Sequence, residues 1–405
     1  MLKRFSIGVL KSYDSVGAIP LELSDALMQH AEMNARLNTP NPEFRITSAQ
    51  YLPLRRRLCA DIYRHDGAYL DNTTALLRLV MNPRGAFARG AESWPVTVMN
   101  RAGRPLASAL LMRARRLPDT LQVAFLEAIS EPRAALDCLL DEARAQARRC
   151  GCTALIVGSN GHVNNGLGLL AGPFGSRPSF GSAYQPPHYV EALSRHAVRT
   201  DTLVTYLHDV ETFPIAADHR LCERVAKRFR VRAGNFSRLA DDIAIYTELN
   251  NSAFARDRFY FERAREEDLE LFRAFGPLLR EENFLVAEYE GRPVGFLLWY
   301  PDFNEWSPPG GAVGLGAVWR YRVLRQRPAR FKLAEVGVRP EFQKSGAILA
   351  LVAHCFGLVR GRYKVCESGW ILNENALSKA LNTRWQGVPD KTYKVFHLDP
   401  GGAPA

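Results

Sequence analysis

The chain has 405 residues, of which 47% are hydrophobic and 23% charged, so it is too long for one compact core and too apolar to be largely disordered. The net charge of +11 favours anionic partners such as nucleotide phosphates, nucleic acid or an acidic membrane surface. From the length we expect two domains. The seven cysteines do not have the spacing of zinc ligands, so we expect reduced thiols and no metal. No apolar run reaches transmembrane length, and we expect a cytoplasmic location.

The N-terminal part predicts an extension over residues 1–44 followed by an α/β unit over 45–212. In chain order we expect a helix at 51–63, hairpin strands at 95–99 and 105–112, a strand at 121–129, a helix at 131–149, and strands at 153–157 and 203–207. A loop rich in Gly, Pro, Ser and Asn interrupts this pattern at 158–188.

The C-terminal part, residues 213–400, repeats the same order of elements. We expect helices at 217–229, 241–253 and 266–279, strands at 284–289, 293–300 and 331–338, a helix ending at 360, a strand at 363–369, a helix at 373–382 and a strand at 392–398. The shared order predicts two copies of one α/β fold with a mixed sheet.

The sharpest local signal is the turn that follows the strand at 331–338. A helix begins directly after Gly346, and the free N–H groups at a helix N-terminus favour an anion. Lys344 and Ser345 add donors, and glycine allows a ligand to approach closely. The turn therefore predicts a seat for a diphosphate, with an ordinary strand–turn–helix connection as the alternative.

The run from Val338 to Ala347 resembles the cofactor loop of GNAT N-acyltransferases, in which Gln or Arg is followed by two residues, Gly, one residue, and Gly or Ala. Ile348 stands where the last Gly or Ala is expected, so the end of the loop departs from the pattern. The resemblance implies binding of acetyl-CoA or a longer acyl-CoA. The implied cofactor-binding residues are Val336, Val338, Gln343, Lys344, Ser345, Gly346, Ala347 and Asn375.

Four further runs are similar to a group of bacterial double-GNAT proteins over about residues 45–400. These runs are 178–189, 300–305, 367–372 and 391–394. Some members of that group act as ceramide synthases, which transfer a fatty acyl group from a thioester to a long-chain amino alcohol. The resemblance implies two tandem GNAT-like acyl-CoA N-acyltransferase folds.

Acyl transfer to an amine requires aligned reactants and a base that removes the amine proton. Glu335 and Glu367 lie on neighbouring expected strands, and either could be that base or a paired structural carboxylate. The tyrosine that GNAT proteins use as a general acid is missing near Leu381 and Asn382. Tyr393 is the substitute candidate, and a half-buried strand tyrosine is the alternative.

The first copy has no cofactor turn of its own, because Ser130-Glu131-Pro132-Arg133 contains an acidic residue and no glycine. We infer that this copy is degenerate and shapes the acceptor site. The basic stretch from Trp319 to Lys332 could lie on an anionic membrane or be a solvated helix face.

We therefore expect an N-acyltransferase for acyl groups other than aminoacyl groups, acting from acyl-CoA on a primary amine that could be amphiphilic. One alternative is a tandem-GNAT ligase that uses aminoacyl-tRNA, although the loop at 343–347 argues against nucleic acid as a partner. The other is a catalytically silent acyl-CoA-binding protein. A peripheral contact with the inner membrane stays open.

Overall fold

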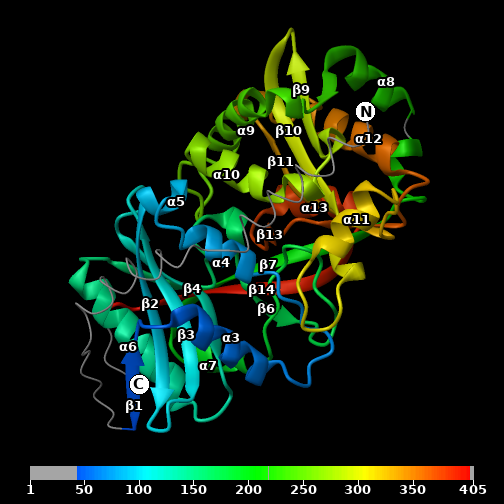
Figure 1. The fold of residues 1–405 in the computed structure, drawn as a ribbon. Helices are drawn as coiled ribbons and strands as arrows, with labels where there is room; N and C mark the ends of the chain where they lie inside the picture. The colour runs from blue at the N-terminus through cyan, green and yellow to red at the C-terminus, as the bar shows by residue number, and fades with distance from the viewer. Residues whose placement is uncertain (1–42, 218, 402–405) are drawn as a thin grey trace.

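The computed structural model describes residues 43–217 and 219–401, so the extension expected at 1–44 lies almost entirely outside the described residues. The described chain forms two halves joined through central strands (Figure 1).

The first half contains the helices and strands that line one end of the sheet. They are β1 (Phe44–Thr47), α3 (Tyr51–Ile62), α4 (Thr74–Val80), α5 (Ala86–Arg89), β2 (Ala91–Asn100), β3 (Pro105–Ala114), β4 (Thr120–Ala128), α6 (Ala134–Arg149), β5 (Ala154–Val157), β6 (Leu169–Gly172), α7 (His188–Ser194) and β7 (Ala197–Asp209). Apolar side chains at helical spacing bury one face of α6 against β2, β3 and β4.

The second half repeats this arrangement with a longer helical entry. Its elements are α8 (His219–Arg228), β8 (Arg230–Ala233), α9 (Leu239–Ala253), α10 (Arg265–Phe275), β9 (Phe284–Tyr289), β10 (Arg292–Pro301), α11 (Leu315–Arg322), β11 (Arg330–Val338), α12 (Ala347–Val359), β12 (Val365–Ser368), β13 (Ile371–Leu372), α13 (Ala376–Arg384) and β14 (Val388–Leu398).

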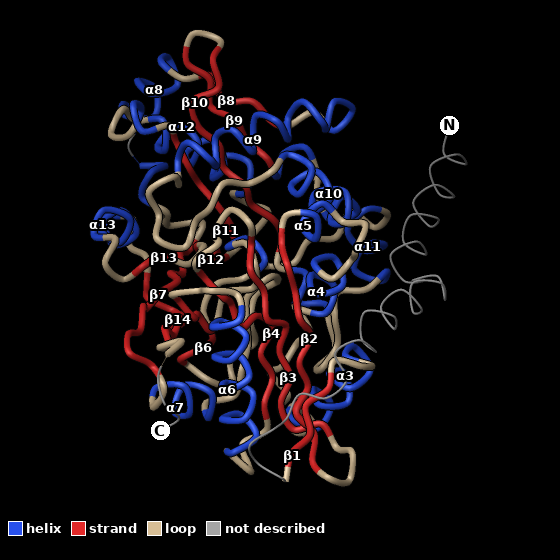
Figure 2. Tube along the Cα trace, turned by 90° about the vertical axis from the view of Figure 1, so that its left-hand side faces the viewer, coloured by secondary structure: helices blue, strands red, loops and turns tan. Residues whose placement is uncertain are grey.

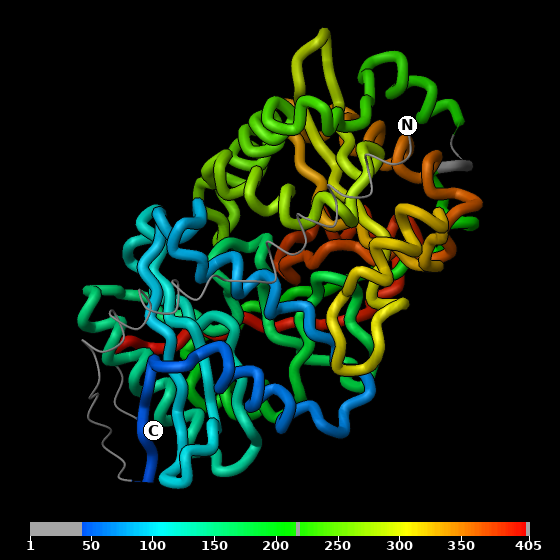
Figure 3. The backbone as a smooth tube through the Cα atoms, viewed as in Figure 1, coloured from blue at the N-terminus to red at the C-terminus, as the bar shows by residue number. Residues whose placement is uncertain are grey.

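One 14-stranded sheet runs through both halves of the described chain. Its main path has the order β1-β2-β3-β4-β5-β14-β7-β12-β11-β10-β9-β8. The last strand of the chain, β14, therefore lies between β5 and β7 of the first half, while β7 pairs with β12 of the second half. Figure 3 traces β14, in red, crossing from the second half into the first. Each half completes the sheet of the other.

Helices cover both faces of this sheet, and Figure 2 shows the two helical layers edge on. Helices α6 and α7, together with α8 and α12, pack on one face. Helices α3, α4, α9 and α10 pack on the other. The mixed α/β class expected from the sequence is confirmed. The sequence had not indicated α7 or the exchange of the final strands, and it had placed a helix at 319–332, later in the chain than α11.

Candidate active site

The site is built where two parallel strands separate. Strand β11 pairs with β12 only over Arg330–Leu333 and Val365–Ser368. At the apex the N–H of Gly369 donates to the carbonyl of Leu333 at 2.6 Å. A Cβ at position 369 would lie 2.5 Å from the Ala334 carbonyl oxygen, so only glycine fits there. Beyond this point the strands part and leave an opening.

A β-bulge in β11 shapes the same opening. Glu335 lies opposite Leu298 and Leu333 lies opposite Trp299, which leaves Ala334 as an extra residue without a cross-strand partner on β10. A bulge interrupts the ladder and changes the direction in which neighbouring side chains point. It lies directly at the apex, so it turns the following part of β11 toward the opening.

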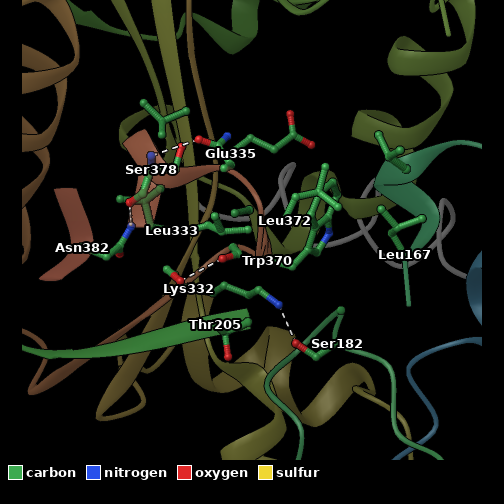
Figure 4. A pocket seen from close by; sticks show the side chains of 18 of the residues that line it. Leu167, Ser182, Thr205, Lys332, Leu333, Glu335, Trp370, Leu372, Ser378 and Asn382 are labelled. Carbon is green, nitrogen blue, oxygen red and sulfur yellow. Dashed lines mark hydrogen bonds between the residues drawn. The ribbon is translucent and has the colours of Figure 1, made fainter. Parts of the chain in front are cut away.

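A cavity of about 300 Å³ occupies the opening, and both halves of the chain line it. The first half contributes Val163, Asn164, Leu167, Ser182, Thr205 and His208, among others. The second half contributes Phe254, Asp257, Phe259, Tyr260, Tyr300, Lys332, Glu335, Val336, Trp370, Leu372, Asn375 and Tyr393, among others. Figure 4 shows that Lys332 extends toward Ser182, whereas Glu335 extends away from it.

Glu335 is the carboxylate of β11 that lines the cavity wall. Its Oε2 accepts a hydrogen bond of 2.7 Å from the Tyr246 hydroxyl, and Arg263 lies 3.8 Å away. Burial raises the pKa of Glu335 above its ordinary value, and Arg263 opposes that rise. The side chain is therefore held in one orientation, with a proton affinity higher than that of a solvated glutamate.

Glu367 is fully buried and is not among the residues that line the cavity. The Ser179 hydroxyl donates to it, and three cations surround it: Lys332 and Lys391 at 3.8 Å and Arg330 at 3.9 Å. The carboxylate thus serves as the counter-ion of buried ammonium groups behind the cavity wall.

Tyr393 lines the cavity from β14 and is 3% exposed. Burial, with a further contribution from Glu367, raises the pKa of its hydroxyl well above the ordinary value. A phenol in this environment is a weak proton donor at neutral pH.

The turn before α12 fits an anionic ligand. Gly346 has φ = +96°, and a Cβ there would lie 2.9 Å from Cγ1 of Val225 on α8. The first hydrogen bond of the helix is donated by Ala350 to the Gly346 carbonyl, so the preceding N–H groups at this helix end have no helical acceptor. Lys344 is exposed beside them, and Arg228 of α8 reaches the Ser345 carbonyl at 3.4 Å.

Helix α12 connects this turn to the cavity. Ile348, Val352 and Phe356 all face the cavity from one side of the helix. The position that departs from the glycine pattern, Ile348, therefore contributes an apolar side chain to the cavity wall. The bend after β11 is open, because Gln343 and Lys344 are both exposed.

Helix α13 forms the opposite wall. Asn375 is its N-cap, and its Oδ1 accepts from the Ser378 N–H at 3.0 Å. Seven residues after this N-cap, Asn382 contacts His208 of β7, with 2.9 Å between Oδ1 and Nε2. Both asparagines and His208 line the cavity.

Four of the predicted catalytic and cofactor-binding residues meet at this cavity: Glu335, Val336, Asn375 and Tyr393. Val338 and the turn at 343–347 lie away from it, at the end of β11 and the start of α12. Sequence reasoning missed Lys332, His208 and Ser182. The last two come from the first half, and no local pattern shows that β7 and the loop at 158–188 face the second half.

In the described part of the chain, no cluster of His, Cys, Asp or Glu could hold a metal ion. Among the described helices, none is long and apolar enough to cross a bilayer.

Comparison with known proteins finds a similarity in the part of the chain that carries most of the cavity. Residues 246–386 match the model of the Acetyltransferase (GNAT) family. Protein YghO of Escherichia coli (strain K12) is 25% identical over 321 residues, which cover 75% of this chain and 81% of YghO.

Solved structures extend the similarity over both halves. A tandem GNAT protein from the clavulanic acid biosynthesis pathway matches with a TM-score of 0.53 at 12% identity, over 89% of this chain and all of the other. A GCN5-related glucosamine N-acetyltransferase region of a fungal multi-domain β-N-acetylglucosaminidase matches with a TM-score of 0.55 at 14% identity. That match covers 90% of this chain and 39% of the fungal one.

Proposed function

We propose an N-acyltransferase that uses acetyl-CoA or a longer acyl-CoA and a primary amine, because residues 246–386 match the GNAT family model and the fold resembles that of a tandem GNAT protein. The acyl group would be other than an aminoacyl group. The observation that carries the proposal is the cavity between β11 and β12, which α12 joins to the exposed turn at its own N-terminus.

The residues of the turn would hold the diphosphate of CoA. The N–H groups of Gln343, Ser345 and Ala347 already donate within the turn, so Gly346 and the first turn of α12 would supply the main-chain donors. Lys344 adds positive charge. The main chain of Val336 and Val338 would lie along the pantetheine arm, facing Asn375. The bound thioester supplies an activated acyl carbon, and the chain positions it beside the amine.

Glu335 would remove the proton from the amine. Its raised pKa brings its proton affinity closer to that required of a base at neutral pH, and Tyr246 fixes its direction. Of the two glutamates, Glu335 is the better candidate, because Glu367 is enclosed by Lys332 and Lys391. A role for Tyr393 as acid toward the thiolate would need a lower pKa than burial gives it, so we assign Tyr393 to the cavity wall.

The acceptor would be an amphiphilic amine, as in ceramide synthases. Apolar and aromatic side chains of both halves supply most of the surface near Glu335, which suits an alkyl chain more than a sugar. The surface includes Leu167, Phe254, Phe259, Trp370 and Leu372.

Calorimetry with CoA tests the cofactor seat. We expect Gly346→Glu to weaken CoA binding at least about 100-fold, since a carboxylate would face the diphosphate. Arg133 is the N-cap of α6, as Gly346 is of α12, so Arg133→Glu is a matched control that should leave CoA affinity within about twofold.

No CoA binding by the wild-type chain would refute the proposal. Binding without transfer to any amine would favour the silent acyl-CoA-binding protein. Retention of aminoacyl-tRNA at physiological salt would favour the ligase.

A further inference from the structure

Helix α11 and the turn after it expose an unusual concentration of large apolar side chains. Four of the eight such side chains in the described residues fall within 315–324. Leu315, Trp319 and Val323 are 50%, 54% and 62% exposed and lie four residues apart, so they form one stripe; Leu324 adjoins it. Leaving this stripe in water is unfavourable, which indicates that something covers it.

Contacts on the inner side of α11 hold the helix, and with it the apolar stripe, in a fixed position. On the other side of α11, Tyr321 is 1% exposed and its ring lies 5.2 Å from that of Phe303. Arg322 donates to the main-chain carbonyls of Gly276, Pro277 and Leu279. These contacts fix α11 in place, so its outer face cannot turn inward without breaking the inner one.

The surroundings of the stripe are basic. Arg320, Arg325 and Arg327 are exposed, and no acidic residue occurs between Trp306 and Ala334. Exposed apolar side chains among arginines suit the boundary between lipid headgroups and acyl chains of an anionic membrane. A second copy of this chain fits less well, since a two-fold contact would bring the same arginines face to face.

The position of α11 in the molecule agrees with a membrane contact. Figure 2 shows α11 and α13 on opposite sides of the molecule. Rings of Tyr321, Phe303, Phe180 and Tyr300 contact one another in sequence, at 5.2, 5.6 and 5.6 Å between centroids, and Tyr300 lines the cavity. Helix α11 therefore packs behind the cavity wall, while α13 lies on the opposite side of the molecule.

We propose that α11 and residues 323–327 seat the protein on an anionic membrane surface. This contact places the cavity wall that contains Tyr300 on the membrane side of the molecule and leaves the exposed Gln343 and Lys344 in water. Delivery of an amphiphilic acceptor from the membrane rests on the proposed function, whereas the membrane contact itself does not.

Flotation of the full chain with phosphatidylcholine vesicles, with and without phosphatidylglycerol, tests the seat. The wild type should bind the phosphatidylglycerol vesicles at least about tenfold more tightly, and added salt should weaken that binding. Val323→Asp should reduce binding at least about tenfold, and Arg325→Gln roughly fivefold. Leu377→Asp, at an equally exposed apolar residue on α13, should change binding less than about twofold.

Equal binding by Val323→Asp and wild type would overturn the seat, as would equal affinity for the two vesicle types. Self-association of the wild type that Val323→Asp abolishes, without vesicle binding, would assign the stripe to a second copy and also overturn it. Acyl transfer to a short, water-soluble amine, measured in parallel, should be the same in wild type and Val323→Asp. Absence of that transfer would count against the proposed function and leave the vesicle result standing.

Discussion

The two halves of the chain end their corresponding strands, β4 and β11, in opposite ways. In the first half, the Ala128 N–H donates to the Tyr189 hydroxyl at 2.6 Å, and the Ala128 carbonyl lies 2.9 Å from Nε2 of His188. Tyr189 is 1% exposed and fills the space beside the strand end. In the second half the corresponding space is the cavity.

The carboxylates of the two strands differ in the same way, because one is enclosed by protein and the other faces the cavity. Glu127 of β4 is 4% exposed and is bound by Arg55 at 3.0 Å and by the hydroxyls of Tyr63 and Tyr189. Glu335 of β11 has one such hydroxyl, an arginine at 3.8 Å and a side facing the cavity. The same fold thus stores one carboxylate in its core and exposes the other to a ligand, and the side chains that fill the interior decide which.

The largest effect should follow from removing the exchanged strand. A chain that ends at residue 385 lacks β14, whose Tyr393, Val395, Phe396 and Leu398 are each at most 3% exposed. Their loss costs about 2–3 kcal/mol per side chain, or roughly 10 kcal/mol in total, which is as large as the stability of a typical protein. We expect no cooperative thermal unfolding in either half.

Val388→Ser on the same strand is the control, because Val388 is 63% exposed. A cooperative transition in the truncated chain would mean that each half folds without the exchange.

Glu335→Gln should lower kcat about 10³-fold and leave CoA affinity within about twofold, because the amide cannot accept the amine proton. In the wild type, kcat/KM should fall as the pH drops through the raised pKa of Glu335, since only the ionised form is a base. Steady-state kinetics over a pH series measures both effects. An unchanged kcat would remove Glu335 from the mechanism.

The matching change in the first half should act on stability and not on catalysis. Glu127→Gln leaves the Arg55 guanidinium without its counter-ion in the core, which should cost about 3 kcal/mol of unfolding free energy in urea. Adding Arg55→Met should recover part of that loss, because no unpaired charge remains. A drop in kcat with unchanged stability would mean that Glu127, like Glu335, takes part in catalysis.

Local pattern was sufficient to predict the turn and the helix start at Gly346, where we propose that the cofactor binds. The glycine, the donors around it and the helix that follows are contiguous in sequence, and Gly346 indeed begins α12 with a positive φ. The sequence also predicted the duplication of the fold, because each copy has its own alternation of strands and helices.

The sequence predicted only some of the residues that line the cavity. Whether Glu335 or Glu367 faces the cavity depends on the bulge at Ala334 and on Lys391, which β14 brings from the end of the chain. The walls formed by His208 and Ser182 depend on which strand lies beside β12, and such long-range pairing leaves no signal in either segment.

The smallest effect should appear at the seam between the halves. Asp302 of the second half accepts a hydrogen bond of 2.8 Å from the Phe180 N–H of the first. Burial raises the pKa of Asp302 from 3.8 to about 6. The folded state therefore binds a proton more tightly than the unfolded state, and this contribution to stability is full below about pH 4 and is lost as the pH rises through about 6.

Asp302→Asn keeps an acceptor oxygen for the Phe180 N–H but cannot ionise, so its unfolding free energy should lack this loss. The variant minus wild-type difference in urea unfolding should increase by about 2–3 kcal/mol in favour of the variant between pH 4 and pH 7. Subtracting the two curves cancels the titration of every group that they share. Parallel curves would mean that Asp302 is solvated in the folded protein, and hence that the two halves meet less tightly at this seam than the contact with Phe180 implies.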